Sequence, residues 1–170
     1  MSSITACAVP AGTLLDAHRL GGSYTDCFVT EIAQAVSHAQ YVEAFYTTAL
    51  FKTERLILSL VLLKPSTDRQ ARELALGQRD SFAAWQVEKR DEDQLILAAG
   101  RTRSWLMVAP APTPGVMATR LYFGSAIVPA RGARAGSNPL GSGFSALLGF
   151  HQLYSRGLLH AARTRLERGR

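Results

Sequence analysis

Three polar side chains near the end of the chain, His151, Tyr154 and Ser155, have the chemistry of a ligand-binding or proton-transfer site. An imidazole exchanges protons near neutral pH, and phenol and hydroxyl groups orient polar ligands. The apolar spacing predicts one long helix over residues 140–166. At about 100° per residue all three side chains fall inside its apolar stripe. The helix therefore places a titratable group where a core or a cavity is expected.

Two interpretations of His151 remain open. The imidazole could donate a ring proton to a carbonyl of a sheet and fill space in the core. It could equally line a cavity with Tyr154 and Ser155 and hold the polar head of a ligand among apolar walls. A general acid or base also needs a partner. We expect that partner to be Asp26, which shares a predicted strand face with Tyr24.

A second group of candidates lies on predicted strands. Alternation places Arg103 and Trp105 on one strand face, and Tyr122 is expected in the next strand as a further cavity wall. If Trp105 faces inward, Arg103 follows it to the rim of the enclosed space and needs an anion there. Asp26, Glu88 or a ligand anion would serve. Alternatively, Arg103 reaches the sheet edge or simply pairs with Glu88.

The sequence lacks the signatures of several common sites. Its four histidines form neither HxH nor HExxH, so a metal site is not expected. The glycines of residues 132–143 occur without GxxxxGK(S/T) or GxGxxG, and there is no GxSxG. We therefore expect no cofactor.

The size and composition are those of one folded domain: 170 residues, 47% hydrophobic and 19% charged. The net charge of +6 arises in residues 130–170, which contain seven arginines and one glutamate. This basic C-terminal end could bind weakly to an anionic surface. Its positive charges would also interact favourably with the dipole at the C-terminus of a helix. Nucleic-acid binding is not favoured, because no aromatic residues alternate with the basic ones.

Cysteine usage and hydropathy favour a cytoplasmic protein. Cys7 and Cys27 form no CxxC motif; a disulfide between them is possible, but reduced thiols are the favoured interpretation. No apolar run approaches the roughly 20 residues that span a bilayer. The N-terminus also lacks the basic cluster of a signal peptide.

Residues 1–22 are expected to form an irregular lead-in, and residues 23–168 a single domain that begins with a strand over 23–32. Helical patterns follow at 37–47, with Ser37 as N-cap, at 50–63 and at 69–76. From residue 81 the period changes to two, which predicts strands at 81–89, 94–99, 101–109 and 116–129.

Short connections between these strands indicate an antiparallel meander, because parallel strands need crossovers of a dozen or more residues. A glycine-rich loop at 130–143 leads to the terminal helix, the element long enough to cover the sheet. The expected fold class is α+β: an antiparallel β-sheet meander gripping a long C-terminal helix, with a short helix pair after the first strand.

This order of elements resembles the helix-grip fold of START-like (Bet v 1-like, SRPBCC) proteins, although five predicted strands are fewer than that superfamily usually has. Three short segments resemble bacterial DUF2867-like proteins of unknown function: Tyr24-Thr25-Asp26, Arg103-Ser104-Trp105 and His151-Gln152-Leu153-Tyr154-Ser155-Arg156. The resemblance implies the fold and an apolar cavity beneath the last helix. It implies no particular activity.

Three alternative functions are consistent with these patterns, besides a packed domain whose role is set by a partner. The first is a binding module for a small apolar or amphipathic ligand between the sheet and the terminal helix. The second is a cyclase, hydrolase or isomerase-type enzyme using His151 and Asp26, and the third is an interaction protein using the basic end. The candidate cavity residues are Tyr24, Asp26, Arg103, Trp105, Tyr122, His151, Tyr154 and Ser155.

Overall fold

The computed structural model describes residues 3–53, 66–112, 117–129 and 144–169, with the side chains of 144–150 left out. Its strands are β1 (Thr5–Ala6), β2 (Tyr24–Ile32), β3 (Ser81–Phe82), β4 (Trp85–Arg90), β5 (Gln94–Ala99), β6 (Thr102–Pro110) and β7 (Thr119–Ile127). Its helices are α1 (Leu14–Leu20), α2 (His38–Tyr46), α4 (Asp68–Ala75) and α5 (Phe144–Arg168).

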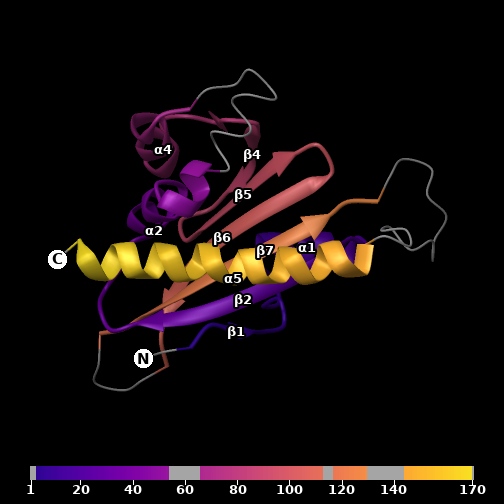
Figure 1. The fold of residues 1–170 in the computed structure, drawn as a ribbon, viewed down its shortest axis with the longest axis horizontal. Coiled ribbons are helices and arrows are strands. Elements are labelled where there is room, and N and C mark those ends of the chain that lie inside the picture. Colours follow the sequence, from indigo (N-terminus) through magenta and orange to yellow (C-terminus); the bar gives the residue numbers. More distant parts are fainter. Residues whose placement is uncertain (1–2, 54–65, 113–116, 130–143, 170) are drawn as a thin grey trace.

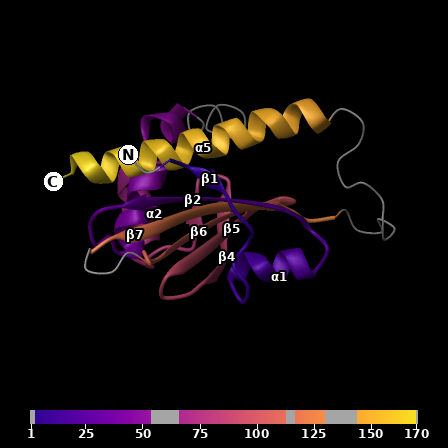
Figure 2. The same cartoon turned by 90° about the horizontal axis from the view of Figure 1, so that it is seen from below.

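The described strands form one antiparallel sheet in the order β1-β2-β7-β6-β5-β4-β3 (Figure 1). Strands β3 to β7 make the meander, and β2 closes it by pairing with the last strand, β7, along its whole length. Helix α5 runs across β2 and β7 beside α2, while α1 lies on the opposite face (Figure 2). The α+β fold class expected from the sequence is confirmed.

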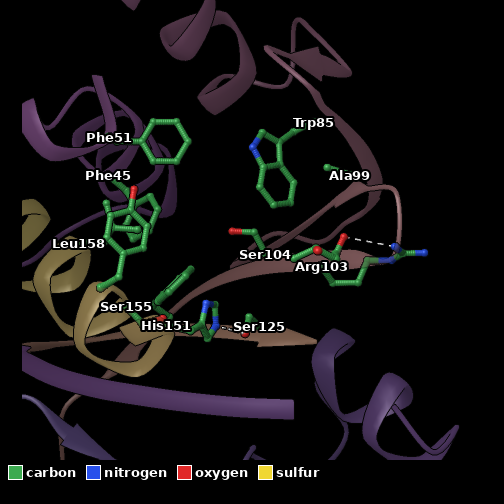
Figure 3. A pocket seen from close by; sticks show the side chains of 13 residues that line it. Phe45, Phe51, Trp85, Ala99, Arg103, Ser104, Ser125, His151, Ser155 and Leu158 are labelled. Atoms are coloured by element: carbon green, nitrogen blue, oxygen red, sulfur yellow. Dashed lines mark hydrogen bonds between the residues drawn. The ribbon is translucent and has the colours of Figure 1, made fainter. Parts of the chain in front are cut away.

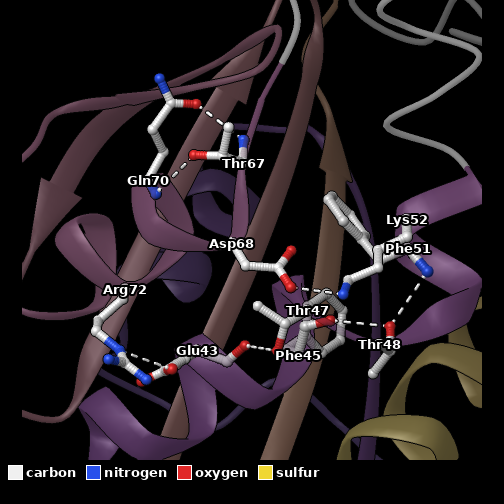
Figure 4. A network of polar contacts seen from close by, with 10 residues as sticks. All are labelled: Glu43, Phe45, Thr47, Thr48, Phe51, Lys52, Thr67, Asp68, Gln70 and Arg72. Atoms are coloured by element: carbon white, nitrogen blue, oxygen red, sulfur yellow. Dashed lines mark hydrogen bonds and ion pairs between the residues drawn. The ribbon is translucent and has the colours of Figure 1, made fainter.

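Helices α2 and α4 begin where the sequence supplies N-caps. Ser37 and Thr67 each accept a hydrogen bond from the backbone N–H three residues on, and Gln40 and Gln70 reach back to complete a capping box. Figure 4 shows how the two helices are joined, with Arg72 Nε of α4 lying 3.0 Å from a Glu43 carboxylate oxygen of α2. The predicted helices at Ser37 and at 69–76 are thereby confirmed.

Each face of the sheet has its own apolar core. On the α5 side, buried aromatic rings of α2 pack on the sheet, with Phe45 lying 4.9 Å from Phe123 between ring centroids. On the α1 side, Leu15 packs against Trp105 and Cys27. The terminal helix shares its face with α2 and is therefore not the sole cover of the sheet.

Two sequence predictions about regular structure were wrong. The lead-in over residues 1–22 contains a strand and helix α1, whose N-cap Thr13 accepts from the Asp16 N–H. The strand expected at 81–89 is interrupted by a tight turn, where Ala83 has a φ of 52°. The sheet accordingly has seven strands where five were expected, because β1 and β3 are only two residues long.

Some predicted elements fall partly outside the described residues. Residues 49–53 are helical, as expected for the helix at 50–63, but the remainder of that prediction is not covered. The predicted loop at 130–143 lies entirely outside the described residues, and so do residues 140–143 of the predicted terminal helix. Within the described segments, no helix is both long enough and apolar enough to cross a bilayer.

Gly124 on β7 gives a direct test of packing beneath α1. A Cβ at this position would overlap the Leu15 side chain and lie 2.8 Å from the Asp26 carbonyl oxygen, which the β2 backbone holds in place. We expect Gly124→Ala to lower the free energy of unfolding by about 1–3 kcal/mol in urea denaturation. Gly157→Ala is the control, because its Cβ would meet only the flexible end of Leu50 and alanine favours the helix. Equal losses in both variants would contradict this packing.

Candidate functional site

A cavity of about 260 Å³ lies between the sheet and helices α2 and α5 (Figure 3). Its walls are largely aromatic, and polar groups enter from the sheet and from α5. The lining consists of Phe45, Phe51, Trp85, Ala99, Thr102, Arg103, Ser104, Phe123, Ser125, His151, Tyr154, Ser155 and Leu158. The interior beside His151 is therefore hollow.

Strand register brings the first two polar groups of the site together. Asp26 on β2 lies directly opposite Ser125 on β7. The Ser125 N–H donates to Asp26 Oδ1 at 3.1 Å, and the Ser125 hydroxyl donates to the same oxygen at 2.7 Å. Because the Asp26 side chain is only 8% exposed, these bonds hold its carboxylate in a fixed position.

Helix α5 adds the imidazole. His151 Nε2 is 2.9 Å from Ser125 Oγ and 3.2 Å from Asp26 Oδ2, so the expected contact between His151 and Asp26 is present. Since the single Ser125 hydroxyl proton goes to Asp26, Ser125 Oγ accepts from an Nε2–H of His151. The other ring nitrogen, Nδ1, then carries the lone pair of the neutral ring and lies on the cavity side in Figure 3.

The arrangement differs from a nucleophilic Ser-His-Asp triad. In such a triad the serine and the carboxylate contact opposite nitrogens of the ring, so that histidine can take the serine proton. Here Ser125 and Asp26 both contact Nε2, and Ser125 donates to Asp26. The group suits an anchored imidazole whose Nδ1 faces the cavity, and it does not activate Ser125 for attack.

Tyr24 supports this region without lining the cavity. It lies two residues before Asp26 on β2 and forms a side-chain hydrogen bond with Gln152 of α5. Partial burial, and secondarily the Asp26 charge, raise the pKa of the Tyr24 phenol. The phenol therefore stays protonated well beyond neutral pH and can serve as a hydrogen-bond donor.

Arg103 borders the cavity at the β5–β6 end, with its charge already paired. Its guanidinium forms an ion pair with Glu88 and donates to the Gly100 carbonyl at 2.9 Å. Glu88 Oε1 also lies 2.6 Å from His18 Nε2 of α1. The simpler of the two expectations for Arg103, pairing with Glu88, is therefore confirmed.

Trp105 and Tyr122 do not belong to the cavity, which corrects the expectation that they form its walls. Both side chains lie on the opposite face of the sheet, in the core beneath α1, with ring centroids 6.2 Å apart. Trp105 Nε1 donates to Gln94 Oε1 at 3.1 Å. Strand alternation correctly placed Trp105 and Ser104 on opposite faces of β6. The face that carries Trp105 packs against α1, a helix that the sequence pattern did not predict.

Several lining residues were missed. Phe45, Trp85 and Ser125 line the cavity, and none of them is among the candidates from the sequence. Alternation places Ser125 on the same strand face as Phe123, which is the one sequence feature that could have pointed to Ser125 as a cavity residue. The sequence pattern does not reveal the register that sets Ser125 opposite Asp26. The structure brings Arg103 and the three α5 residues to the cavity, with Asp26 behind His151.

Apart from Arg103 Nε, which forms an ion pair with Glu88, two buried polar atoms of the lining residues have no hydrogen-bond partner among the described residues. They are Trp85 Nε1 and the hydroxyl of Ser155, a residue that is fully buried. A buried unpaired donor costs free energy in the folded state. A ligand acceptor that entered the cavity could recover part of this cost after a small side-chain rotation.

The basic end forms a separate, open surface. A second hollow of about 620 Å³ is lined by Thr48, Ala49, His160, Ala161, Thr164, Arg165, Arg168 and Gly169. Other cations of this end are already engaged: Arg163 Nε lies 2.9 Å from Glu167, and Arg156 lies over the Phe28 ring. Over the described part of the chain, no three His, Cys, Asp or Glu side chains form a group that could hold a metal ion.

The two buried serines of the cavity give a matched test. Ser125→Ala removes hydrogen bonds to Asp26 and His151, and we expect it to lower the free energy of unfolding by about 1–3 kcal/mol. Ser155→Ala removes a hydroxyl that has no partner in the described structure, and it should raise that free energy by roughly 0.5–1 kcal/mol. Urea unfolding measures both changes. Equal effects of the same sign would contradict the statement that the Ser125 hydroxyl is hydrogen-bonded and the Ser155 hydroxyl is not.

Comparison with protein-family models, with curated proteins and with solved structures gave no match. The resemblance to START-like and DUF2867-like proteins therefore stays a prediction, and the site is interpreted from its own geometry.

Proposed function

We propose that this protein binds a small amphipathic molecule in the cavity between α5 and the sheet. The observation that carries the proposal is an aromatic-walled space with an anchored imidazole in its wall. Phe45, Phe123 and Leu158 offer apolar surface, while His151 offers a polar contact whose direction Asp26 fixes. Apolar walls with a few oriented polar groups are typical of small-molecule sites.

The cavity limits the size of the ligand. At about 30 Å³ for each water-sized group, about 260 Å³ holds on the order of ten non-hydrogen atoms. That is one ring or a short chain with a polar head, rather than a whole lipid tail. The unpaired donors of Trp85 and Ser155 favour a head that accepts hydrogen bonds, such as a carbonyl or carboxylate.

The proposal agrees with a START-like assignment, which we retain as a proposal as well. Its support is the order of elements: one long strand, short helices, an antiparallel meander and a final helix across the sheet. The cavity lies beneath that final helix, where the resemblance implies one.

Binding is testable with an internal control, because the chain has two tryptophans and they lie on opposite faces of the sheet. We expect cyclohexanecarboxylate, and more weakly cyclohexylmethanol, to shift the indole N–H signal of Trp85 in ¹H–¹⁵N spectra in a saturable way. The Trp105 signal should stay in place, since that ring lies beneath α1. Trp85→Phe assigns the two signals.

Ser155→Leu is the matched variant, because a larger apolar side chain at this position fills the cavity without touching the α1 side. It should abolish the Trp85 shift and keep the Trp105 signal of the folded protein. Equal shifts of both indole signals, or no shift with millimolar probe, would contradict the binding proposal.

A second candidate function, an enzyme that moves a proton, is favoured by the orientation of His151. Its Nε2 is held by Ser125 and Asp26, which leaves Nδ1 as a base facing the cavity. Asp26 would stabilise the imidazolium that forms when Nδ1 takes a proton. The chemistry that fits is removal of a proton next to a carbonyl group, the first step of many isomerisations and cyclisations.

The proton-transfer proposal predicts deuterium exchange at the carbon next to the carbonyl of cyclohexanone in D₂O. We expect His151→Gln to reduce the protein-catalysed exchange by about 100-fold or more, the ordinary contribution of a general base. Asp26→Asn should also reduce it, because the amide would donate to Nε2 and move the ring proton to Nδ1. Exchange that persists in His151→Gln would rule out this role and leave the binding function unaffected.

A further inference from the structure

Cys7 directly follows β1 and lies opposite Cys27 of β2, on the sheet face turned away from the cavity. Strands β1 and β2 pair with Ala6 opposite Phe28, and the same register sets Cys7 opposite Cys27. The Cys7 N–H donates to the Cys27 carbonyl at 3.0 Å, and the two Sγ atoms are 3.4 Å apart. Both thiols are free.

The backbone geometry already suits a disulfide. Directly opposite residues of an antiparallel pair have Cα atoms about 4.5–5.5 Å apart, which lies inside the roughly 4.4–6.8 Å range of disulfides. The two sulfur atoms must approach from 3.4 Å to a bonded distance of about 2 Å. Side-chain rotation can supply this approach, so neither strand has to move.

The two thiols differ in access and in acidity. Cys27 is buried, whereas Cys7 is half-buried. The hydrogen bond between the two thiols, and secondarily the Arg120 charge, lower the pKa of Cys7 against the opposing effect of burial. The same hydrogen bond, burial and the Asp26 charge raise the pKa of Cys27. Because the thiolate is the nucleophile, Cys7 is the thiol that reacts first.

We propose that Cys7 and Cys27 form a redox-modification site, which a low-molecular-weight disulfide such as oxidised glutathione converts to an intramolecular disulfide. The Cys7 thiolate attacks one sulfur of glutathione disulfide and expels a glutathione thiolate. The Cys27 thiol then loses its proton to solvent and attacks Cys7 Sγ, and the second glutathione thiolate leaves. Two protein thiols become one disulfide, while one glutathione disulfide becomes two thiols.

The bond would tie the N-terminal segment to the sheet. It closes a loop over residues 7–27 that contains α1, the helix covering Trp105. Loop closure restricts the unfolded chain, so oxidation should raise the Tm by roughly 5–10 °C. Cys27 is the neighbour of Asp26 on β2, so the strand fixed by the disulfide is also the one that carries the carboxylate of the cavity site.

The test uses the full chain in buffers of graded reduced and oxidised glutathione. Samples are quenched with acid, alkylated under denaturing conditions with N-ethylmaleimide, and analysed by intact mass and peptide mapping. We expect the wild-type protein to pass from two alkylated thiols to none, with Cys7 and Cys27 in one linked peptide pair, no retained glutathione and a higher Tm. Stable glutathione on wild-type Cys7, covalent dimers, or two free thiols in fully oxidised buffer would overturn the proposal.

Single variants separate the two steps. Cys27→Ser should stop at a lasting mixed disulfide between Cys7 and glutathione, because the second thiol is gone. Cys7→Ser should leave the buried Cys27 unmodified in the folded protein. Modification of Cys27 at the wild-type rate in Cys7→Ser would overturn the assigned order of attack. The wild-type peptide map decides the proposal even if a variant folds poorly.

Discussion

The pairing of β2 with β7 is the interaction on which the rest of the structure depends. It joins the first long strand to the last and sets Asp26 opposite Ser125, so a carboxylate and a hydroxyl meet without any loop to position them. It also provides the surface on which α5 lies, and therefore the place where His151 reaches the pair. The polar centre of the cavity thus follows from strand register.

Both faces of this sheet are covered, and the two covers have different roles. Leu15 of helix α1 packs tightly against Trp105 and Gly124 of the sheet, which leaves no room for a larger side chain at residue 124. Helices α2 and α5 cover the other face but leave a cavity between Phe45 and Trp85. A tightly packed face supports the sheet rigidly, so that the opposite face can keep a cavity.

The sequence predicted what depends on local pattern. The cap at Ser37, the alternation along β6 and the α+β class follow from propensity and spacing, and the contact between His151 and Asp26 was expected from the shared interior. The register between β2 and β7 was not predictable, because it depends on pairing between residues about a hundred positions apart. That register decides which serine meets Asp26. The sequence analysis placed Trp105 on the wrong face because it did not predict helix α1. Seven residues with a single cap at Thr13 give too weak a periodic signal to reveal a helix on that face.

The distance along the chain between Asp26 and Ser125, 99 residues, has a consequence for folding. Contacts between such distant residues carry a large loop-closure cost and are slow to form. The cavity is thus complete only when the meander has formed and β2 has closed it. The molecule that we propose to bind beside His151 would therefore bind the native state and not the unfolded chain. Such a molecule would stabilise the native state. It would slow unfolding and leave the rate of folding unchanged.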